Sequence, residues 1–107
     1  MSSPPSIDVL LTGGSGQVGT EVIAHAPAGV NIVAPGRDRL DMSDPDALVA
    51  MVASHPWAAV INCAAHTAVD RAEGEILAAW KINALAPAAL AQATAQAGIP
   101  LIQVSTD

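Results

Sequence analysis

The chain of 107 residues is poor in cysteine, in basic residues and in long apolar runs. Its single cysteine, Cys63, excludes an internal disulfide framework and is typical of a reducing compartment. Four Lys and Arg against ten Asp and Glu give a net charge of −6, without the basic surface of a nucleic-acid-binding protein. No apolar run could cross a bilayer, and residues 1–6 lack the features of a signal peptide. We therefore expect a cytoplasmic protein with no nucleic-acid or membrane partner.

The chain does contain a regular alternation of short apolar runs and helical patterns. This alternation is typical of successive βα units, whose parallel strands are apolar throughout because helices cover both faces of the sheet. Strands are predicted over residues 7–11, 30–34, 59–62 and 101–105. Helices are predicted over about 16–26, from Pro45 to before His55, and over about 75–97 with a kink at Pro87.

These elements predict an α/β fold with a Rossmann-like, doubly wound parallel sheet that is partial, with about four strands. Right-handed crossovers would arrange the strands in the order 3-2-1-4. A ligand is then expected at the carboxyl ends of the strands, beside the switch point between the first and fourth strands. Residues that carry chemistry should follow the strands directly.

A glycine-rich loop, TGGSGQVG (residues 12–19), follows the first predicted strand. Glycines there allow a tight turn, the close approach of a pyrophosphate to the backbone, and close packing of the next helix on the sheet. The diphosphate would lie at the N-terminus of that helix, where unpaired N–H groups favour negative charge. A glycine-rich turn without a ligand is the alternative. The predicted dinucleotide-binding residues are Gly13, Gly16, Gln17, Val18 and Gly19.

The second strand is followed by the charged turn PGRDR, residues 35–39. An arginine in this position accommodates the 2′-phosphate of NADP, whereas a carboxylate binds the ribose 2′-hydroxyl of NAD. Arg37 therefore favours NADPH, and Asp38 leaves NADH possible. A merely solvated turn is the third alternative.

The third strand is followed by small residues, Ala64 and Ala65, against which the riboses of a cofactor could lie. His66 has the residue type of a general base, but a single hydrogen bond beside the cofactor is the more common role. Cys63 is interpreted as a core residue, and no metal cluster is predicted because it has no partners at zinc-ligand spacing. After the fourth strand, a hydroxyl in Ser105-Thr106 could bind a substrate carbonyl.

Five segments in order carry a resemblance to a known family: TGGSGQVG, RLDMSDPDAL, NCAAHTAVDRAE, KINALAPAALA and VSTD. Together they span almost the whole chain, which resembles the N-terminal part of the dTDP-4-dehydrorhamnose reductases. These extended short-chain dehydrogenases/reductases reduce the C4 keto group of dTDP-6-deoxy-L-lyxo-4-hexulose with NAD(P)H to give dTDP-L-rhamnose.

The resemblance assigns cofactor contacts to three parts of the chain. Gly16, Gln17 and Val18 would meet the diphosphate, and Arg37 the adenosine ribose or its phosphate. The adenine would contact Asp41 and Met42. The riboses and nicotinamide would be flanked by Ala64, Ala65, His66 and Thr67.

The resemblance also implies roles in catalysis. Thr106 would be the hydroxyl member of a catalytic Ser/Thr-Tyr-Lys set, and Asp107 would lie at the sugar-nucleotide site. Asn83 matches an asparagine linked to proton relay, with structural capping as the alternative. Some members depend on Mg²⁺, for which Glu21 is a candidate ligand unless it is only a surface carboxylate.

One departure from the family is the absence of tyrosine, which rules out the YxxxK pair within these residues. Lys81, the only lysine, precedes Thr106 and would lie on the wrong helix to substitute for the lysine of that pair. The sugar-binding C-terminal domain is also missing. We therefore expect residues 1–107 to be the N-terminal part of an NAD(P)-binding Rossmann domain, inactive alone and homo-oligomeric. A non-catalytic dinucleotide-binding module, similar to the regulatory β subunit of methionine adenosyltransferase, is the alternative.

Overall fold

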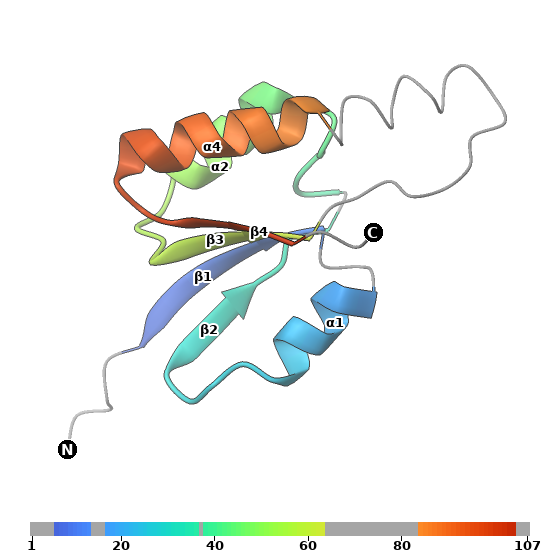
Figure 1. Ribbon diagram of the computed structural model, residues 1–107, viewed down its shortest axis with the longest axis vertical. Coiled ribbons are helices and arrows are strands. Elements are labelled where there is room, and N and C mark those ends of the chain that lie inside the picture. The colour runs from blue at the N-terminus through green and yellow to red at the C-terminus, as the bar shows by residue number, and fades with distance from the viewer. Residues whose placement is uncertain (1–5, 14–16, 37, 64–83, 105–107) are drawn as a thin grey trace, which may run out of the picture.

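The structure, a computed structural model, describes residues 6–13, 17–36, 38–63 and 84–104. Within these ranges the chain forms a three-layer arrangement in which a parallel sheet separates one helix from two others (Figure 1). The strands are β1 (Ile7–Thr12), β2 (Val30–Val33), β3 (Ala59–Asn62) and β4 (Leu101–Gln103). The helices are α1 (Gln17–Ala24), α2 (Pro45–Ala53) and α4 (Ala86–Ala97). This architecture confirms the predicted α/β, Rossmann-like fold.

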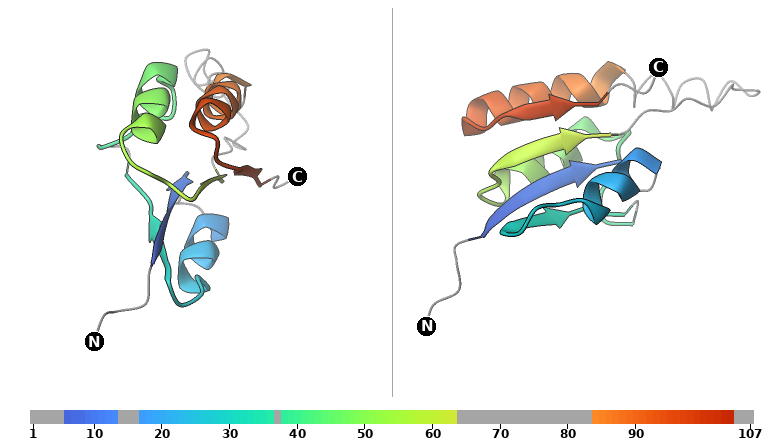
Figure 2. Two further views of the ribbon diagram at one scale, coloured as in Figure 1. Left: turned by 90° about the vertical axis from the view of Figure 1, so that its left-hand side faces the viewer. Right: turned by 60° about the horizontal axis from the view of Figure 1, so that its bottom comes forward.

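The order of the strands is β2-β1-β3-β4, so the predicted order 3-2-1-4 is wrong. The reason is the face on which each helix lies: α1 covers one face, whereas α2 and α4 lie side by side on the other (Figures 1 and 2). Right-handed crossovers on opposite faces run in opposite directions. The connection through α2 therefore carries the chain back past β1, and β3 pairs with β1 rather than with β2. The switch point accordingly lies between β1 and β3.

The main core lies between the sheet and the layer formed by α2 and α4. Leu10 and Val60 contribute to it from the sheet, and Leu48 and Leu90 from the two helices, all fully buried. Trp57 closes one end of this core, and its indole N–H donates a hydrogen bond to the Met51 carbonyl at 3.0 Å. Packing of α2 against α4 therefore holds two successive βα units together.

The ends of the helices follow the predicted signals. Asp44 caps α2 by accepting hydrogen bonds from the backbone N–H groups of Asp46 and Ala47, and Pro45 occupies the first turn. Gly98 ends α4 in the left-handed conformation, with φ of 72°. The helix predicted over about 75–97 is described as α4 from Ala86 onward, after π-helical residues at 84–85, and Pro87 lies in the first turn of α4. The predicted residues before position 84 lie outside the described ranges.

A polar cluster joins three elements near the amino ends of the strands. Asp8 of β1 lies 2.6 Å from Nε2 of His55, which follows α2, and accepts a hydrogen bond from Asn31 of β2 at 3.2 Å. The hydrogen bond from His55, followed by that from Asn31, lowers the pKa of the Asp8 carboxyl below its ordinary value of 3.8. The His55 ring also lies against the Trp57 indole, with 4.4 Å between ring centroids.

We predict that this cluster makes stability depend on pH in the acid range. Because folding lowers the pKa of Asp8, its contribution is present above the pKa of the unfolded chain, about 4, and is lost as the pH falls through the lower folded value. Replacement His55→Gln should make the unfolding free energy less dependent on pH below about 5. Urea titrations across this range would measure the effect, with His25→Gln, at the exposed residue just after α1, as the control. Superimposable profiles for wild type and His55→Gln would contradict the prediction.

Candidate functional site

The candidate site is the carboxyl end of the sheet at the switch point between β1 and β3. The last residue of β1, Thr12, is followed by Gly13 with φ of 73°, a left-handed conformation that strains other residues. Helix α1 begins at Gln17, so its N-terminal N–H groups follow the loop that leaves β1. A strand, a left-handed glycine and a helix N-terminus thus succeed one another as a dinucleotide loop requires.

A row of polar side chains crosses the sheet where three strands end, and sequence reasoning missed it. Thr12 and Asn62 are paired in register on β1 and β3, and the Thr12 hydroxyl donates to Asn62 Oδ1 at 2.7 Å. Asn62 Nδ2 donates in turn to Gln103 Oε1 on β4 at 3.2 Å. The signal in the sequence that could have revealed it is the polar residue that ends each of these three mostly apolar strands.

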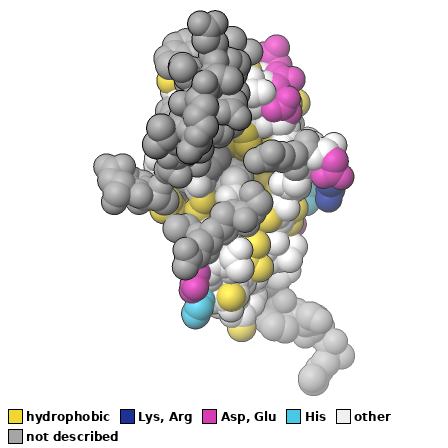
Figure 3. Space-filling model, turned by 90° about the vertical axis from the view of Figure 1, so that its right-hand side faces the viewer, with side chains coloured by type: hydrophobic (Ala, Val, Ile, Leu, Met, Phe, Trp, Pro, Cys, Tyr) yellow, Lys and Arg dark blue, Asp and Glu magenta, His cyan; other side chains and the backbone are white. Residues whose placement is uncertain are grey.

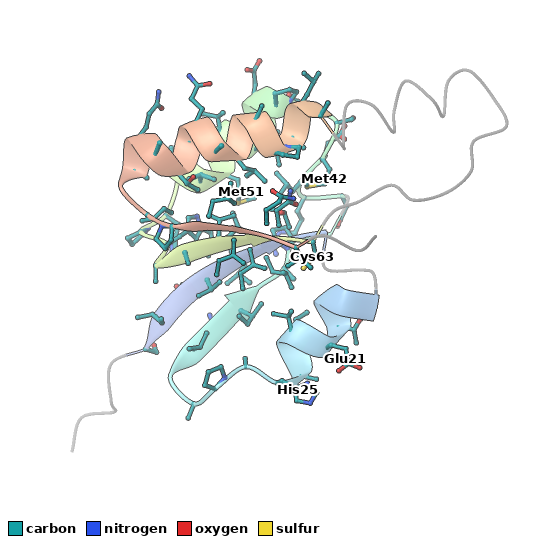
Figure 4. All side chains as sticks on the ribbon, in the orientation of Figure 1. Glu21, His25, Met42, Met51 and Cys63 are labelled. Atoms are coloured by element: carbon teal, nitrogen blue, oxygen red, sulfur yellow. The ribbon has the colours of Figure 1, made fainter. Side chains whose placement is uncertain are left out.

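Cys63 follows β3 directly and is buried at this end of the sheet (Figure 4). Its backbone N–H donates to the Thr12 carbonyl at 2.8 Å, which continues the pairing of β1 and β3 by one more bond. Burial raises the pKa of the Cys63 thiol, so the reactive thiolate is disfavoured. These properties agree with its interpretation as a core residue rather than a nucleophile.

The segment that connects β2 with α2 begins with a turn in which the N–H of Leu40 donates to the Gly36 carbonyl at 2.9 Å. The exposed Asp41 carboxylate then accepts hydrogen bonds from Ser43, at 2.9 Å from the backbone nitrogen and 2.6 Å from the hydroxyl. Met42, labelled in Figure 4, is half-buried against the main core. The segment thus holds Asp41 at the surface and turns Met42 inward.

The surface at this end of the sheet is shown in Figure 3, where acidic side chains lie beside one basic group. Arg39, an exposed residue in the turn after β2, is the one basic residue in the described part of the chain. An anionic cofactor would therefore have to be held by local donors, because the chain as a whole carries a charge of −6.

Several predicted site residues can be placed. Gly13 follows β1, while Gln17, Val18 and Gly19 belong to the first turn of α1. Glu21 lies on the exposed surface of α1, with its carboxylate 3.6 Å from His25 Nδ1 (Figure 4). Among the described residues no group of three potential metal ligands occurs, so the Mg²⁺ site stays a prediction. The remaining predicted residues lie outside the described ranges: Gly16, Arg37, Ala64, Ala65, His66, Thr67, Asn83, Thr106 and Asp107.

No helix among the described residues is both long enough and apolar enough to cross a membrane.

Comparison with known proteins places this fold in a family. The family described as "RmlD substrate binding domain" matches residues 7–107. The chain belongs to this family. The dTDP-4-dehydrorhamnose reductase of Streptomyces griseus is 44% identical over 108 residues, which cover all of this chain and 36% of that relative. The chain therefore spans about a third of the length of such relatives, and the resemblance seen in the sequence is confirmed.

Solved structures of relatives share the fold. The dTDP-4-dehydrorhamnose reductase of Clostridium acetobutylicum has a TM-score of 0.82 and 35% identity, over 92% of this chain and 36% of its own. The reductase of Bacillus anthracis, solved in complex with NADP, has a TM-score of 0.79 and 30% identity, over 94% of this chain and 36% of its own.

We predict that Gly13→Ala impairs dinucleotide binding by more than its effect on folding explains. An L residue at a positive φ costs about 1–2 kcal/mol of stability. Gly98→Ala is a matched control, because Gly98 has nearly the same φ, 72° against 73°, but lies at the end of α4, before β4 begins. Urea unfolding should show similar losses for both variants, whereas calorimetric titration with NADPH should show weaker binding only for Gly13→Ala. Equal NADPH affinities of the two folded variants would contradict a binding role for this loop.

Proposed function

We propose that residues 1–107 form the N-terminal part of the NAD(P)H-binding domain of a dTDP-4-dehydrorhamnose reductase. The observation that carries the proposal is the strand, left-handed glycine and helix unit at the switch point, in a chain that matches the family over residues 7–107. The reductase would transfer a hydride from NADPH to the C4 keto group of a dTDP-4-keto-6-deoxyhexose. A reducing, cytoplasmic location suits the single unpaired cysteine.

The cofactor fits the described geometry at its diphosphate. Backbone N–H groups at the start of α1 and the left-handed turn at Gly13 offer the donors and the close approach that a diphosphate requires. The NADP complex of the Bacillus anthracis relative supports NADPH as the cofactor. Arg37 would pair with the 2′-phosphate, and Asp41 and Met42 would contact the adenine. The riboses and nicotinamide would be flanked by Ala64, Ala65, His66 and Thr67.

The substrate would be held near the end of β4. Thr106 would donate a hydrogen bond to the C4 carbonyl oxygen, and Asp107 would contact the sugar nucleotide. The acid that protonates this oxygen must lie elsewhere in the protein, because these 107 residues contain no tyrosine. Assembly of the full-length enzyme as a homo-oligomer is part of the same proposal.

The direct test is an assay of the full-length protein with NADPH and the dTDP-4-keto sugar. NADPH oxidation that depends on the keto sugar, with dTDP-L-rhamnose as the product, would support the proposal. Another deoxysugar product would change the substrate but not the reaction. Dinucleotide binding without turnover would instead favour a regulatory binding module.

We predict that Arg37→Ala separates the two cofactors. A charge-assisted contact between a guanidinium and a 2′-phosphate contributes roughly 1.5–3 kcal/mol. In the full-length protein the variant should therefore bind NADPH about tenfold or more weakly, while NADH, which lacks this phosphate, binds nearly as before. Calorimetric titrations with both cofactors provide the comparison. Equal losses for NADPH and NADH would assign Arg37 to another role.

We predict that Thr106→Val lowers kcat more than it raises KM. A hydroxyl that stabilises the carbonyl oxygen acts more strongly in the transition state than in the bound substrate. Valine keeps the shape of threonine without its donor, and Thr106→Ser, which keeps the donor, should retain activity. Steady-state kinetics of the three full-length proteins would show the difference. Wild-type turnover by Thr106→Val would make Thr106 a packing residue.

We predict that the 107-residue chain alone does not oxidise NADPH with the keto sugar. A positioned general acid contributes about 10²–10⁴ in rate, and holding the sugar in place contributes more. Both contributions need groups beyond these residues, so only weak dinucleotide binding is expected. The assay requires protein free of full-length enzyme. Turnover by such a preparation would show that the catalytic acid lies within residues 1–107.

A further inference from the structure

The row formed by Thr12, Asn62 and Gln103 is unusual because two of its members are polar and completely buried. Thr12 and Asn62 have no exposed surface, whereas Gln103 lies at the exposed edge of the sheet. All three are aligned in register: Thr12 pairs with Asn62, and Asn62 pairs with Gln103. Their side chains form a continuous chain of hydrogen bonds across β1, β3 and β4, at 2.7 and 3.2 Å.

Stability alone does not require this row. The backbone already joins the same strand ends, since the N–H of Cys63 donates to the Thr12 carbonyl at 2.8 Å and that of Val104 to the Asn62 carbonyl at 3.0 Å. Exchanging both partners of a buried hydrogen bond for apolar groups of similar shape is often nearly neutral in stability. The polar row adds specificity for one register, because each of its hydrogen bonds forms only in one alignment of the neighbouring strands.

Each member of the row is also the last residue of its strand. Gly13 and the predicted diphosphate loop follow Thr12, while Cys63 and the predicted ribose-flanking segment follow Asn62. After Gln103, only two residues separate β4 from Thr106. The row therefore lies where three segments of the candidate site leave the sheet.

We propose that Thr12 and Gln103 act through Asn62 as positioning residues that fix the three strand ends relative to one another, at Gly13, Cys63 and Val104. The inference rests on the proposed function for the identity of the segments. Its physical basis is the hydrogen-bonded row itself: the Thr12 hydroxyl occupies Asn62 Oδ1, which turns the Asn62 amide N–H toward Gln103. Loss of either outer partner removes one hydrogen bond of the row from the buried amide and frees the strand ends to shift.

The test compares Thr12→Val, Thr12→Ser and Gln103→Met, because Asn62 makes a further interaction and its replacement would test more than the row. Thr94→Val is the matched control: Thr94 is another buried threonine, but its hydroxyl donates to the Leu90 carbonyl within α4 at 2.8 Å. For each folded variant of the full-length protein, NADPH affinity is measured by calorimetry and stability by urea unfolding. Amide shifts at Gly13, Cys63 and Val104 are measured by NMR.

Thr12→Val and Gln103→Met should each weaken NADPH binding roughly 2- to 30-fold and shift the amide signals at all three strand ends. Thr12→Ser should restore both properties, and Thr94→Val should leave both unchanged. A lower urea midpoint with unchanged NADPH affinity and unshifted Val104 would overturn the proposal, because the row would then be only structural. If the wild-type full-length protein bound no NADPH, the proposed function would fail. The NMR shifts would still test the positioning role of the row. Shifts confined to the neighbours of the replaced residue would overturn that role.

Discussion

The pairing of β1 with β3 is the constraint on which the rest of this structure depends. It joins residues 50 positions apart in sequence, and it exists because α1 and α2 cover opposite faces of the sheet. With right-handed connections on opposite faces, the chain winds outward in two directions from β1 and β3. Open α/β sheets bind their ligands at such a switch point, outside the carboxyl ends of the strands.

Local features of the fold could be predicted from the sequence, because they depend on neighbouring residues. The apolar runs located all four strands, and Asp44 and Gly98 marked the ends of two helices. The order of the strands could not be predicted in this way. Handedness fixes the direction of a crossover only once the face of its helix is known, and the apolar pattern of a doubly covered strand does not distinguish its faces. With right-handed crossovers, the predicted order requires α2 to lie on the same face as α1, whereas it lies on the opposite face.

The candidate site likewise has one part that local sequence predicts and one part that it does not. The glycine loop was predictable because its spacing is a local pattern, and the described ends of that loop have the expected conformations at Gly13 and Gln17. The polar row was not predictable, because it depends on the register of three strands. Thr12, Asn62 and Gln103 come from distant parts of the chain and become neighbours only when β1, β3 and β4 are aligned. In α/β sequences, polar residues at strand ends can therefore become neighbours that no local pattern reveals.

The two faces of the sheet differ in how well they are covered. The buried cluster lies on the face of α2 and α4, and Leu101 of β4 packs against it. Side chains alternate along a strand, so the next residue, Ile102, points to the face of α1, and half of its surface is exposed. Helix α1 lies over the β1 and β2 side of that face (Figure 2). Further protein, from the same chain or from a second copy, would gain stability by packing against Ile102, since burying an isoleucine side chain contributes about 1.5–3 kcal/mol. The predicted homo-oligomer and the longer chains of the relatives offer two ways of covering it.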